Sequence, residues 1–369
     1  MNILFAGEAG VKERERRWMS FIQNRLLSFF YIKENMDDKQ QIFSLELIRE
    51  VNKMKKNKVD LMLDSGAFSA WSKQVEIDID EYIAFCLQHV DIVSYIVNLD
   101  VIPGKFGQKN LPREEVERSA RKGYENYEYM LSKGIPKSKL IHVFHQNEDF
   151  KWLQKMVKEI EYIGISPAND RTTSEKILWL DKCMKYALDE KGMPLVKFHG
   201  FAVTSLQLLM RYPFYSVDST SWVMTGRLGS IYVPRYRSGK WIYDENSWKI
   251  AVSSKSPANK EAGKHFSTLS PKHQQVVLDY IHDKGYVMGV SSFESVPQTT
   301  ELKPNQKWSQ KKPTSKTALR ELETIMEPGL ANTYQLRDEI NIIYFMDLEK
   351  DLPKWPWAYK RTSSAGFGL

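Results

Sequence analysis

Residues 139–166, KLIHVFHQNEDFKWLQKMVKEIEYIGIS, contain the pattern that decides the fold. A short apolar run at 139–146 is followed by an amphipathic segment at about 149–159 and by a second apolar run at 161–166. Short apolar runs of this kind are typical of strands that are buried on both faces of a parallel sheet, with helices outside. The stretch therefore predicts two parallel strands joined by a helix.

Strands and helices continue to alternate on both sides of this stretch, through about the first 220 residues. Further strands are predicted at 2–6, 26–32, 59–64, 93–100, 194–201 and 213–219, and further helices at about 11–24, 43–56, 79–90, 114–134, 174–192 and 204–211. Eight strands with helices between them predict a (β/α)8 barrel of the α/β class. A doubly wound open sheet is the alternative, although GEAG at 7–10 lacks the third glycine of a nucleotide-binding loop.

The pattern changes beyond the neighbourhood of Asp218. We predict one domain, the barrel, over 1–255 and a mixed helical and irregular extension over 256–369 that packs on the barrel. Within this part, 231–243 predicts a hairpin turning at Ser238-Gly239, 273–290 a helix and a strand, and 303–320 a basic loop leading into a helix. Aromatic residues near the end are expected to anchor the tail by packing; they are Trp355, Trp357 and Tyr359.

Composition limits the class of protein. The chain has 369 residues, of which 42% are hydrophobic, and it carries 53 Lys and Arg against 46 Asp and Glu. This excess permits a polyanionic partner, although many basic enzymes bind no nucleic acid. The two cysteines, Cys86 and Cys183, are too few for a disulfide framework or a structural zinc site. With no apolar run near ~20 residues, we expect a cytoplasmic protein without a membrane partner.

Polar residues follow the ends of the predicted strands, where the catalytic residues of a barrel lie. They are Asp64, Asp100, His145, Gln146, Ser166, His199, Gly200 and Asp218. A single aspartate at a strand end more often caps the next helix than takes part in chemistry. Three carboxylates and two imidazoles around one rim instead favour a polar binding site.

Five of these segments resemble the tRNA-guanine transglycosylase superfamily. LDSGAFS (63–69) is similar to its TDSGGFQ signature, and NLDVIPG (98–104) to its strand ending in FDEC. FHQNED (144–149) resembles its VQGG strand end, FHGFAVTS (198–205) its MGVG strand, and YSVDSTSWVMTGR (215–227) its DMFDCVLPTR segment. The five occur in the family's order over about 1–245. The closest resemblance is to the branch in phages and bacterial genomic islands that inserts 7-deazaguanine bases into DNA.

The resemblance implies a role for each matching residue. Asp218 is the implied nucleophile and Asp64 the acid/base, while Asp100 and Gln146 would bind the edge and the carbonyl of the base. Phe68 and His199 would form the two stacking faces, although the family usually has Met at the second position. Further substrate-binding candidates are Ser65, Gly66, His145, Gly164 and Gly200, of which Gly164 is a poor match to the family's glycine pair.

The chemistry of base exchange needs these residue types. A carboxylate near C1′ can trap the sugar covalently while a second acid protonates the departing base, as in retaining glycoside hydrolysis. Aromatic walls, formed by Phe68 and by Trp71 or Trp222, would exclude water. A base within a duplex must be flipped out, so a basic rim is needed. The rim candidates follow Asp218, and a solvated surface explains them equally well: Arg227, Arg235, Arg237 and Lys240.

Three functions stay open at this stage. The tRNA enzymes carry clustered zinc-binding Cys and His residues after the last strand, whereas this chain has no cysteine after Cys183. The difference favours replacement of guanine in DNA by a free 7-deazaguanine base, with no metal or cofactor. The alternatives are the same exchange on tRNA, with a queuine-type base, and a barrel that only binds nucleic acid or a base.

Overall fold

The chain divides into two compact units. The computed structural model describes residues 1–7, 22–34, 40–54, 59–104, 108, 111–168, 170–255, 261, 263–309 and 319–360. Unit 1 comprises Met1–Thr220 and Leu352–Leu369, and unit 2 comprises Ser221–Asp351. The predicted boundary at 255 lies inside unit 2, because helix α10 (Ser221–Arg227) packs against the late helix α12 (Tyr334–Asp351).

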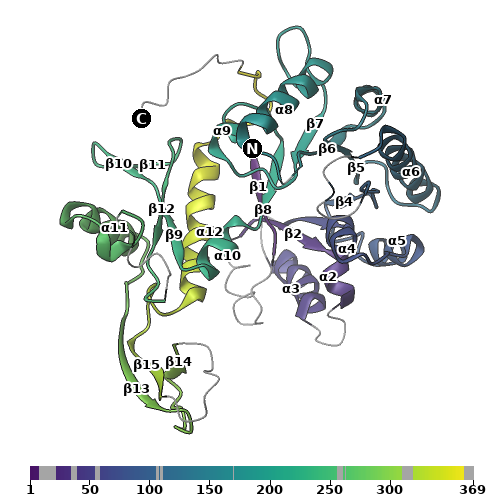
Figure 1. Ribbon diagram of the computed structural model, residues 1–369. Helices are drawn as coiled ribbons and strands as arrows, with labels where there is room; N and C mark the ends of the chain where they lie inside the picture. The colour runs from purple at the N-terminus through teal and green to yellow at the C-terminus, as the bar shows by residue number, and fades with distance from the viewer. Residues whose placement is uncertain are drawn as a thin grey trace. The chain divides into compact units, whose positions relative to one another are not determined.

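Unit 1 is built on a closed barrel of eight parallel strands (Figure 1). β8 pairs in parallel with β1, with Leu4 opposite Asp218, and this pairing closes the barrel and excludes the open-sheet alternative. The strands are β1 (Asn2–Phe5), β2 (Asn24–Ser28), β3 (Asp60–Asp64), β4 (Tyr95–Val97), β5 (Leu140–His145), β6 (Tyr162–Ser166), β7 (Lys197–Gly200) and β8 (Ser216–Ser219).

Helices connect the strands, as in a TIM-barrel-like α/β fold. They are α2 (Phe29–Glu34), α3 (Gln40–Met54), α4 (Ala67–Lys73), α5 (Ile79–Gln88), α6 (Arg113–Ser132), α7 (Phe150–Glu159), α8 (Thr173–Ala187) and α9 (Leu206–Leu209). The predicted strand at 26–32 was wrong in its second half, since β2 ends at Ser28 and α2 begins at Phe29. Helix α4 was not predicted. The helix expected at 11–24 lies largely outside the described residues.

Alternation along the strands determines which side chains point into the barrel. Leu26, Met62 and Val143 belong to one buried cluster that fills the interior. Side chains two positions further along a strand point to the same face. Ser28, Asp64 and His145 therefore face inward too, one layer nearer the carboxyl end.

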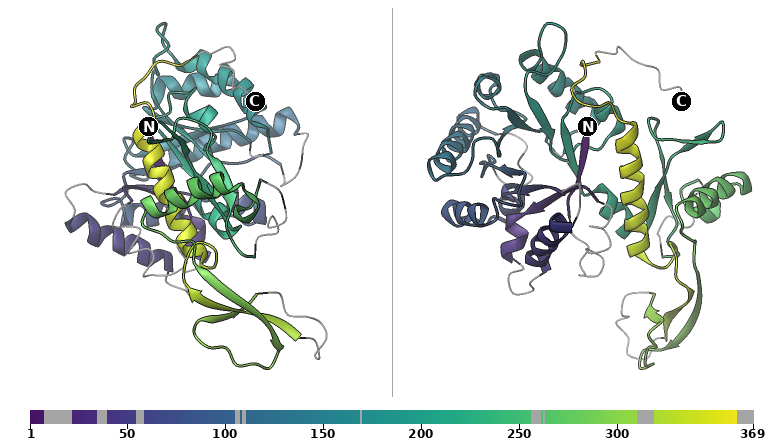
Figure 2. Two further views of the ribbon diagram at one scale, coloured as in Figure 1. Left: turned by 90° about the vertical axis from the view of Figure 1, so that its left-hand side faces the viewer. Right: turned by 180° about the vertical axis from the view of Figure 1, so that it is seen from behind.

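Unit 2 combines two small antiparallel sheets, a hairpin and three α-helices among its described residues. Its core packs Ile231, Val277 and Ile340. Its elements are α10, β9 (Ser230–Val233), β10 (Arg235–Arg237), β11 (Lys240–Ile242), β12 (Trp248–Ala251), η2 (Phe266–Thr268), α11 (Pro271–Asp283), β13 (Val290–Pro297), β14 (Gln306–Trp308), β15 (Leu319–Glu327) and α12. The predicted turn at Ser238-Gly239 is confirmed, since it joins β10 to β11. Figure 2 shows β13 and β15 as a long ribbon that projects from the rest of the unit.

Two predictions for the late part of the chain have different outcomes. The helix expected after the basic loop is wrong, because the described residues there form strands β14 and β15, and 310–318 lie outside the description. The tail does pack as predicted: the Trp355 ring meets Tyr215 edge-on at 5.4 Å, and the Tyr359 hydroxyl donates to Asp181 at 2.6 Å. In the described part of the chain, no helix has the length and apolar character needed to cross a bilayer.

Candidate active site at the barrel mouth

The barrel brings three carboxylates to the carboxyl ends of its strands. Asp64 is the last residue of β3, Asp218 lies in β8, and Asp100 follows β4 by three residues. Burial, and then the charges of Asp100 and Asp218, raise the pKa of Asp64 to about 7. Like charges at short range disfavour ionisation. One of the three carboxyl groups is therefore a proton donor near neutral pH.

The turn after Asp64 is held by contacts within the fold. Gly66 has φ +83°, and a Cβ there would lie 2.3 Å from Phe30 Cβ and 2.6 Å from Ser28 Oγ. Its N–H donates to Asp64 Oδ2 at 3.0 Å, and the buried Ser65 hydroxyl accepts from Ala67 N at 3.3 Å. Glycine is thus required for the turn and for close packing, not for approach to a ligand, and the Ser65 side chain is not exposed to one.

Helix capping does not explain two of the three aspartates. Helix α4, which follows Asp64, has Gly66 at its N-cap, and α6, which follows Asp100, has Pro112 there. The third carboxylate, Asp218, accepts a hydrogen bond at 2.9 Å from the backbone N–H of Ala202, which follows the neighbouring strand β7. The alternative reading of these residues as helix caps is therefore removed for Asp64 and Asp100.

A chain of polar side chains inside the barrel ends on Asp218. His199 Nε2 lies 3.3 Å from Asp218 Oδ1, and His199 Nδ1 lies 2.6 Å from Ser216 Oγ, which in turn contacts the Tyr162 hydroxyl. An ionised carboxylate only accepts hydrogen bonds, so Nε2 carries the proton in this arrangement and Nδ1 accepts from Ser216. His199 is 0% exposed and cannot present a stacking face, which corrects its predicted role. It positions Asp218 instead.

The backbone beside Asp218 is strained. Ala202, whose N–H binds Asp218 Oδ1, has φ +51°, a conformation that L-residues other than Asn and Asp rarely adopt. Such residues cost about 1–3 kcal/mol and cluster at functional sites. Both contacts go to Oδ1, so Oδ2 is the oxygen that faces no donor among the described residues.

Asp100 pairs with His145 on the neighbouring strand. His145 Nε2 lies 2.5 Å from Asp100 Oδ2. Burial opposes protonation of His145, but the hydrogen bond and charge of Asp100, together with Glu148, outweigh it and raise the pKa of the imidazole. Burial also raises the pKa of Glu148 to about 7. Sequence reasoning missed Glu148, although it stands within the FHQNED segment, because it lies beyond the predicted end of the strand at 146.

Two aromatic rings and an amide complete the mouth. The Phe68 side chain on α4 is 46% exposed, and its ring centroid lies 5.7 Å from that of Trp71. Phe201 packs on the barrel interior and covers Gly164, where a Cβ would lie 2.5 Å from its ring. Phe201 is thus the second aromatic surface, and Gly164 lies beneath it rather than against a ligand. Gln146 Oε1 accepts from Ala168 N at 2.9 Å, which leaves the amide N–H groups of Gln146 as donors.

Two of the other predicted residues are buried. Gly200 is buried, with Phe214 3.1 Å from an added Cβ. Trp222 is 1% exposed and cannot wall a pocket. The basic rim candidates all belong to unit 2. Among them Arg235 stacks on Trp248 at 4.6 Å, Arg237 pairs with Glu245 at 2.8 Å, Lys240 is exposed on the same hairpin, and Arg227 lines a separate cavity.

Neither a protein-family model nor a curated protein matches the chain. In the described residues, no group of three or more His, Cys, Asp or Glu side chains is arranged to hold a metal ion. A function must therefore be inferred from the chemistry of the mouth.

The raised pKa of Asp64 predicts a stability effect. The folded pKa of about 7 exceeds the ordinary 3.8, so between these values the folded state binds more protons than the unfolded state, and stability is lost as pH rises through 7. Asp64→Asn removes the charge and keeps an acceptor for Gly66 N. We expect it to raise the free energy of unfolding at about pH 8 by at most about 4 kcal/mol, about three pKa units at ~1.4 kcal/mol each.

Urea denaturation of the wild-type and Asp64→Asn proteins at two pH values measures this effect. Near pH 4 the difference should fall below about 1 kcal/mol, because Asp64 is then protonated in the folded state and still about half protonated in the unfolded state. A variant that is destabilised to the same extent at both pH values would contradict the assignment of a high pKa to Asp64.

Proposed function

We propose that this protein is a base-exchange transglycosylase that replaces guanine in DNA with a 7-deazaguanine derivative. The proposal rests on two carboxyl groups at one mouth. Asp64 is protonated near neutral pH, and Asp218 is held by hydrogen bonds to Oδ1 alone. The ordered resemblance of five segments to guanine transglycosylases supports the same chemistry. The basic balance of the chain supports a polyanionic substrate.

In the first half-reaction, Asp218 Oδ2 attacks C1′ of the target nucleotide. A bond forms between Oδ2 and C1′, the C1′–N9 bond breaks, and the electron pair leaves with the guanine. Asp64 gives its proton to the departing base, so that a neutral guanine is released. The His199 and Ala202 contacts orient Asp218, which reduces the entropy cost of attack.

In the second half-reaction, the ionised Asp64 removes the N9 proton of the incoming 7-deazaguanine. The deprotonated N9 of the base then attacks C1′. The bond between C1′ and Asp218 Oδ2 breaks, which regenerates the Asp218 carboxylate. Two displacements retain the configuration at C1′, as in retaining glycosidases. Because Asp64 works first as acid and then as base, a pKa of about 7 suits both steps.

The remaining mouth residues fit recognition of a flat, polar base. Phe68 and Phe201 offer aromatic surfaces for stacking, which contributes about 1–3 kcal/mol per base in single-strand complexes. The Gln146 amide can donate to a base carbonyl, and Asp100 can accept from the ring N–H and amino groups of guanine. His145 holds the Asp100 carboxylate in place.

Incubation with a labelled 7-deazaguanine tests the proposal. The protein is supplied with duplex DNA, single-stranded DNA or tRNA, and nucleosides from each are analysed by mass spectrometry. We expect label in DNA together with release of an equal amount of guanine. Label in tRNA alone would support base exchange but would reject DNA as the substrate. Binding of the base without label in either polymer would favour a binding barrel and reject an enzyme.

A further inference from the structure

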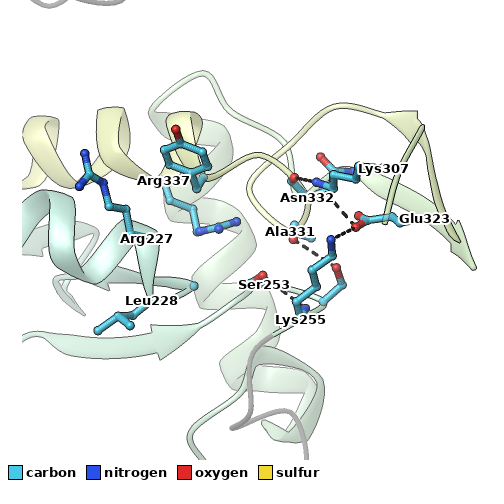
Figure 3. Close-up of a pocket in the computed structure, with 12 residues that line it drawn as sticks. Arg227, Leu228, Ser253, Lys255, Lys307, Glu323, Ala331, Asn332 and Arg337 are labelled. Carbon is cyan, nitrogen blue, oxygen red and sulfur yellow. Dashed lines mark hydrogen bonds and ion pairs between the residues drawn. The ribbon is translucent and has the colours of Figure 1, made fainter. Parts of the chain in front are cut away.

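Unit 2 contains a cavity of about 430 Å³ that the proposed base exchange does not use (Figure 3). It lies where the first turn of α12 meets the ends of β12 and α10. Its lining carries four cationic side chains against one carboxylate, a formal excess of three positive charges: Arg227, Lys255, Lys307 and Arg337 against Glu323. Small residues, among them Gly229, Ser253 and Ala331, leave the space open.

The carboxylate neutralises only part of this charge. Glu323 is 0% exposed; its Oε2 lies 2.9 Å from Lys255 Nζ and 3.6 Å from Lys307 Nζ, and its Oε1 accepts from Ser291. Both lysines therefore reach across the cavity toward one shared partner, as Figure 3 shows by its dashed lines. Crowding of two ammonium groups on one carboxylate leaves one positive charge uncompensated.

Arg337 adds a buried charge without an acidic partner. It is 5% exposed, and its Nε and Nη1 donate to the carbonyl oxygens of Gly226 and Leu330. In the described residues, no carboxylate forms an ion pair with it. Burial lowers the pKa of this guanidinium to about 10, despite the nearby charges of Asp338 and Glu323. A buried cation held only by neutral carbonyls is costly unless an anion joins it.

The backbone contributes a further positive potential. Tyr334 and Arg337 in the lining belong to the first turn of α12, an 18-residue helix with no acidic side chain in that turn. The N-terminus of a long helix attracts anions through its unpaired N–H groups and its dipole. The lysines, the buried arginine and the helix thus act in the same direction.

We propose that this cavity is a binding site for a phosphate group. Arginine and lysine side chains at a helix N-terminus are the usual donors for phosphate oxygens. The volume exceeds that of phosphate alone and suits a nucleotide-sized ligand. The phosphate belongs either to a free nucleotide or to a nucleic-acid chain. This site lies in unit 2 and is independent of the chemistry proposed for the barrel mouth.

Titration calorimetry on the whole protein at about 0.1 M salt tests the site. The probes are inorganic phosphate, pyrophosphate, UMP, uridine without phosphate, and a short single-stranded DNA without guanine, so that none of them carries the base proposed to bind at the barrel mouth. The test variant is Arg227→Gln with Lys307→Gln, which keeps the closer pair between Lys255 and Glu323. The control is Lys249→Gln with Lys272→Gln, which removes two exposed positive charges from the same unit but outside the cavity.

We expect the phosphate-bearing probes to bind, uridine to fail, and the test variant to lose affinity about tenfold or more while the control changes less than about twofold. Glu323→Gln should strengthen binding about threefold or more, a gain that misfolding cannot produce. Binding of UMP identifies a nucleotide as the source, and binding of the oligonucleotide alone identifies nucleic acid. Equal losses in both double variants, or no binding of any phosphate probe at millimolar concentration, would overturn the proposal.

Discussion

Asp218→Asn is expected to lose base exchange by on the order of 10⁴-fold or more, because an amide oxygen is a poor nucleophile toward C1′. The substitution is nearly isosteric and keeps an oxygen for the Ala202 N–H, which lies 2.9 Å from Oδ1. We therefore expect the variant to fold and to retain affinity for the base. The rate of label incorporation into DNA measures the loss, and near-ultraviolet circular dichroism checks the fold.

A matched control distinguishes the nucleophile from a general effect of charge. Asp60 begins β3 and is exposed at the opposite end of the barrel, where it accepts from the Ser94 hydroxyl. Asp60→Asn removes the same charge and should keep exchange within about twofold, as distant surface substitutions usually do. Full activity of Asp218→Asn would remove the covalent mechanism.

Asp64→Asn is expected to reduce exchange by about 10² to 10⁴-fold, the usual contribution of general acid–base catalysis. With a pKa of about 7, Asp64 is protonated below neutrality and ionised above it. Guanine release in a single turnover should therefore fall as pH rises above 7. The attack of the incoming base should fall as pH drops below 7. Both dependences should disappear in the variant.

Glu148 supplies the control for this pH dependence, because its pKa is also about 7. Glu148 lies beside His145 and takes no part in the proposed proton transfer. Glu148→Gln should therefore still show the decrease in the rate of guanine release as pH rises above 7. Rapid-quench measurement of guanine release between about pH 5.5 and 8.5 compares the three proteins. If this decrease persists in Asp64→Asn and disappears in Glu148→Gln, Glu148 and not Asp64 is the general acid.

The barrel and its carboxylates were accessible from the sequence because their signals are local. Apolar runs locate buried strands, and the carboxyl ends of parallel strands must meet at one edge, so Asp64, Asp100 and Asp218 could be grouped without coordinates. The second half of the strand predicted at 26–32 was wrong for a related reason. An apolar run buried in a helix has the same composition as one buried in a strand, and its length does not separate them.

The finer roles depended on contacts between distant residues. His199 reads as a side chain at a strand end, but its orientation toward Ser216 and Asp218 follows from the pairing of β7 with β8. Phe201 lies within the segment FHGFAVTS (198–205). The sequence does not show that its ring packs over Gly164 and forms a surface of the mouth. Strand β15 is polar and shows little alternation of apolar residues. Neither the three-stranded sheet that contains it nor the cavity lined by Glu323 could therefore be predicted from the sequence.

The proposed mechanism requires a glycosyl group that is bound covalently to Asp218, and this intermediate can be trapped. Wild-type protein is mixed with a guanine-containing oligonucleotide without incoming base, denatured in acid, digested and analysed by mass spectrometry. We expect a peptide that carries an abasic sugar on Asp218, is absent from Asp218→Asn and is lost when a 7-deazaguanine is added before quenching. An adduct on another residue, or base exchange by the wild-type protein with no adduct at any time point, would contradict it.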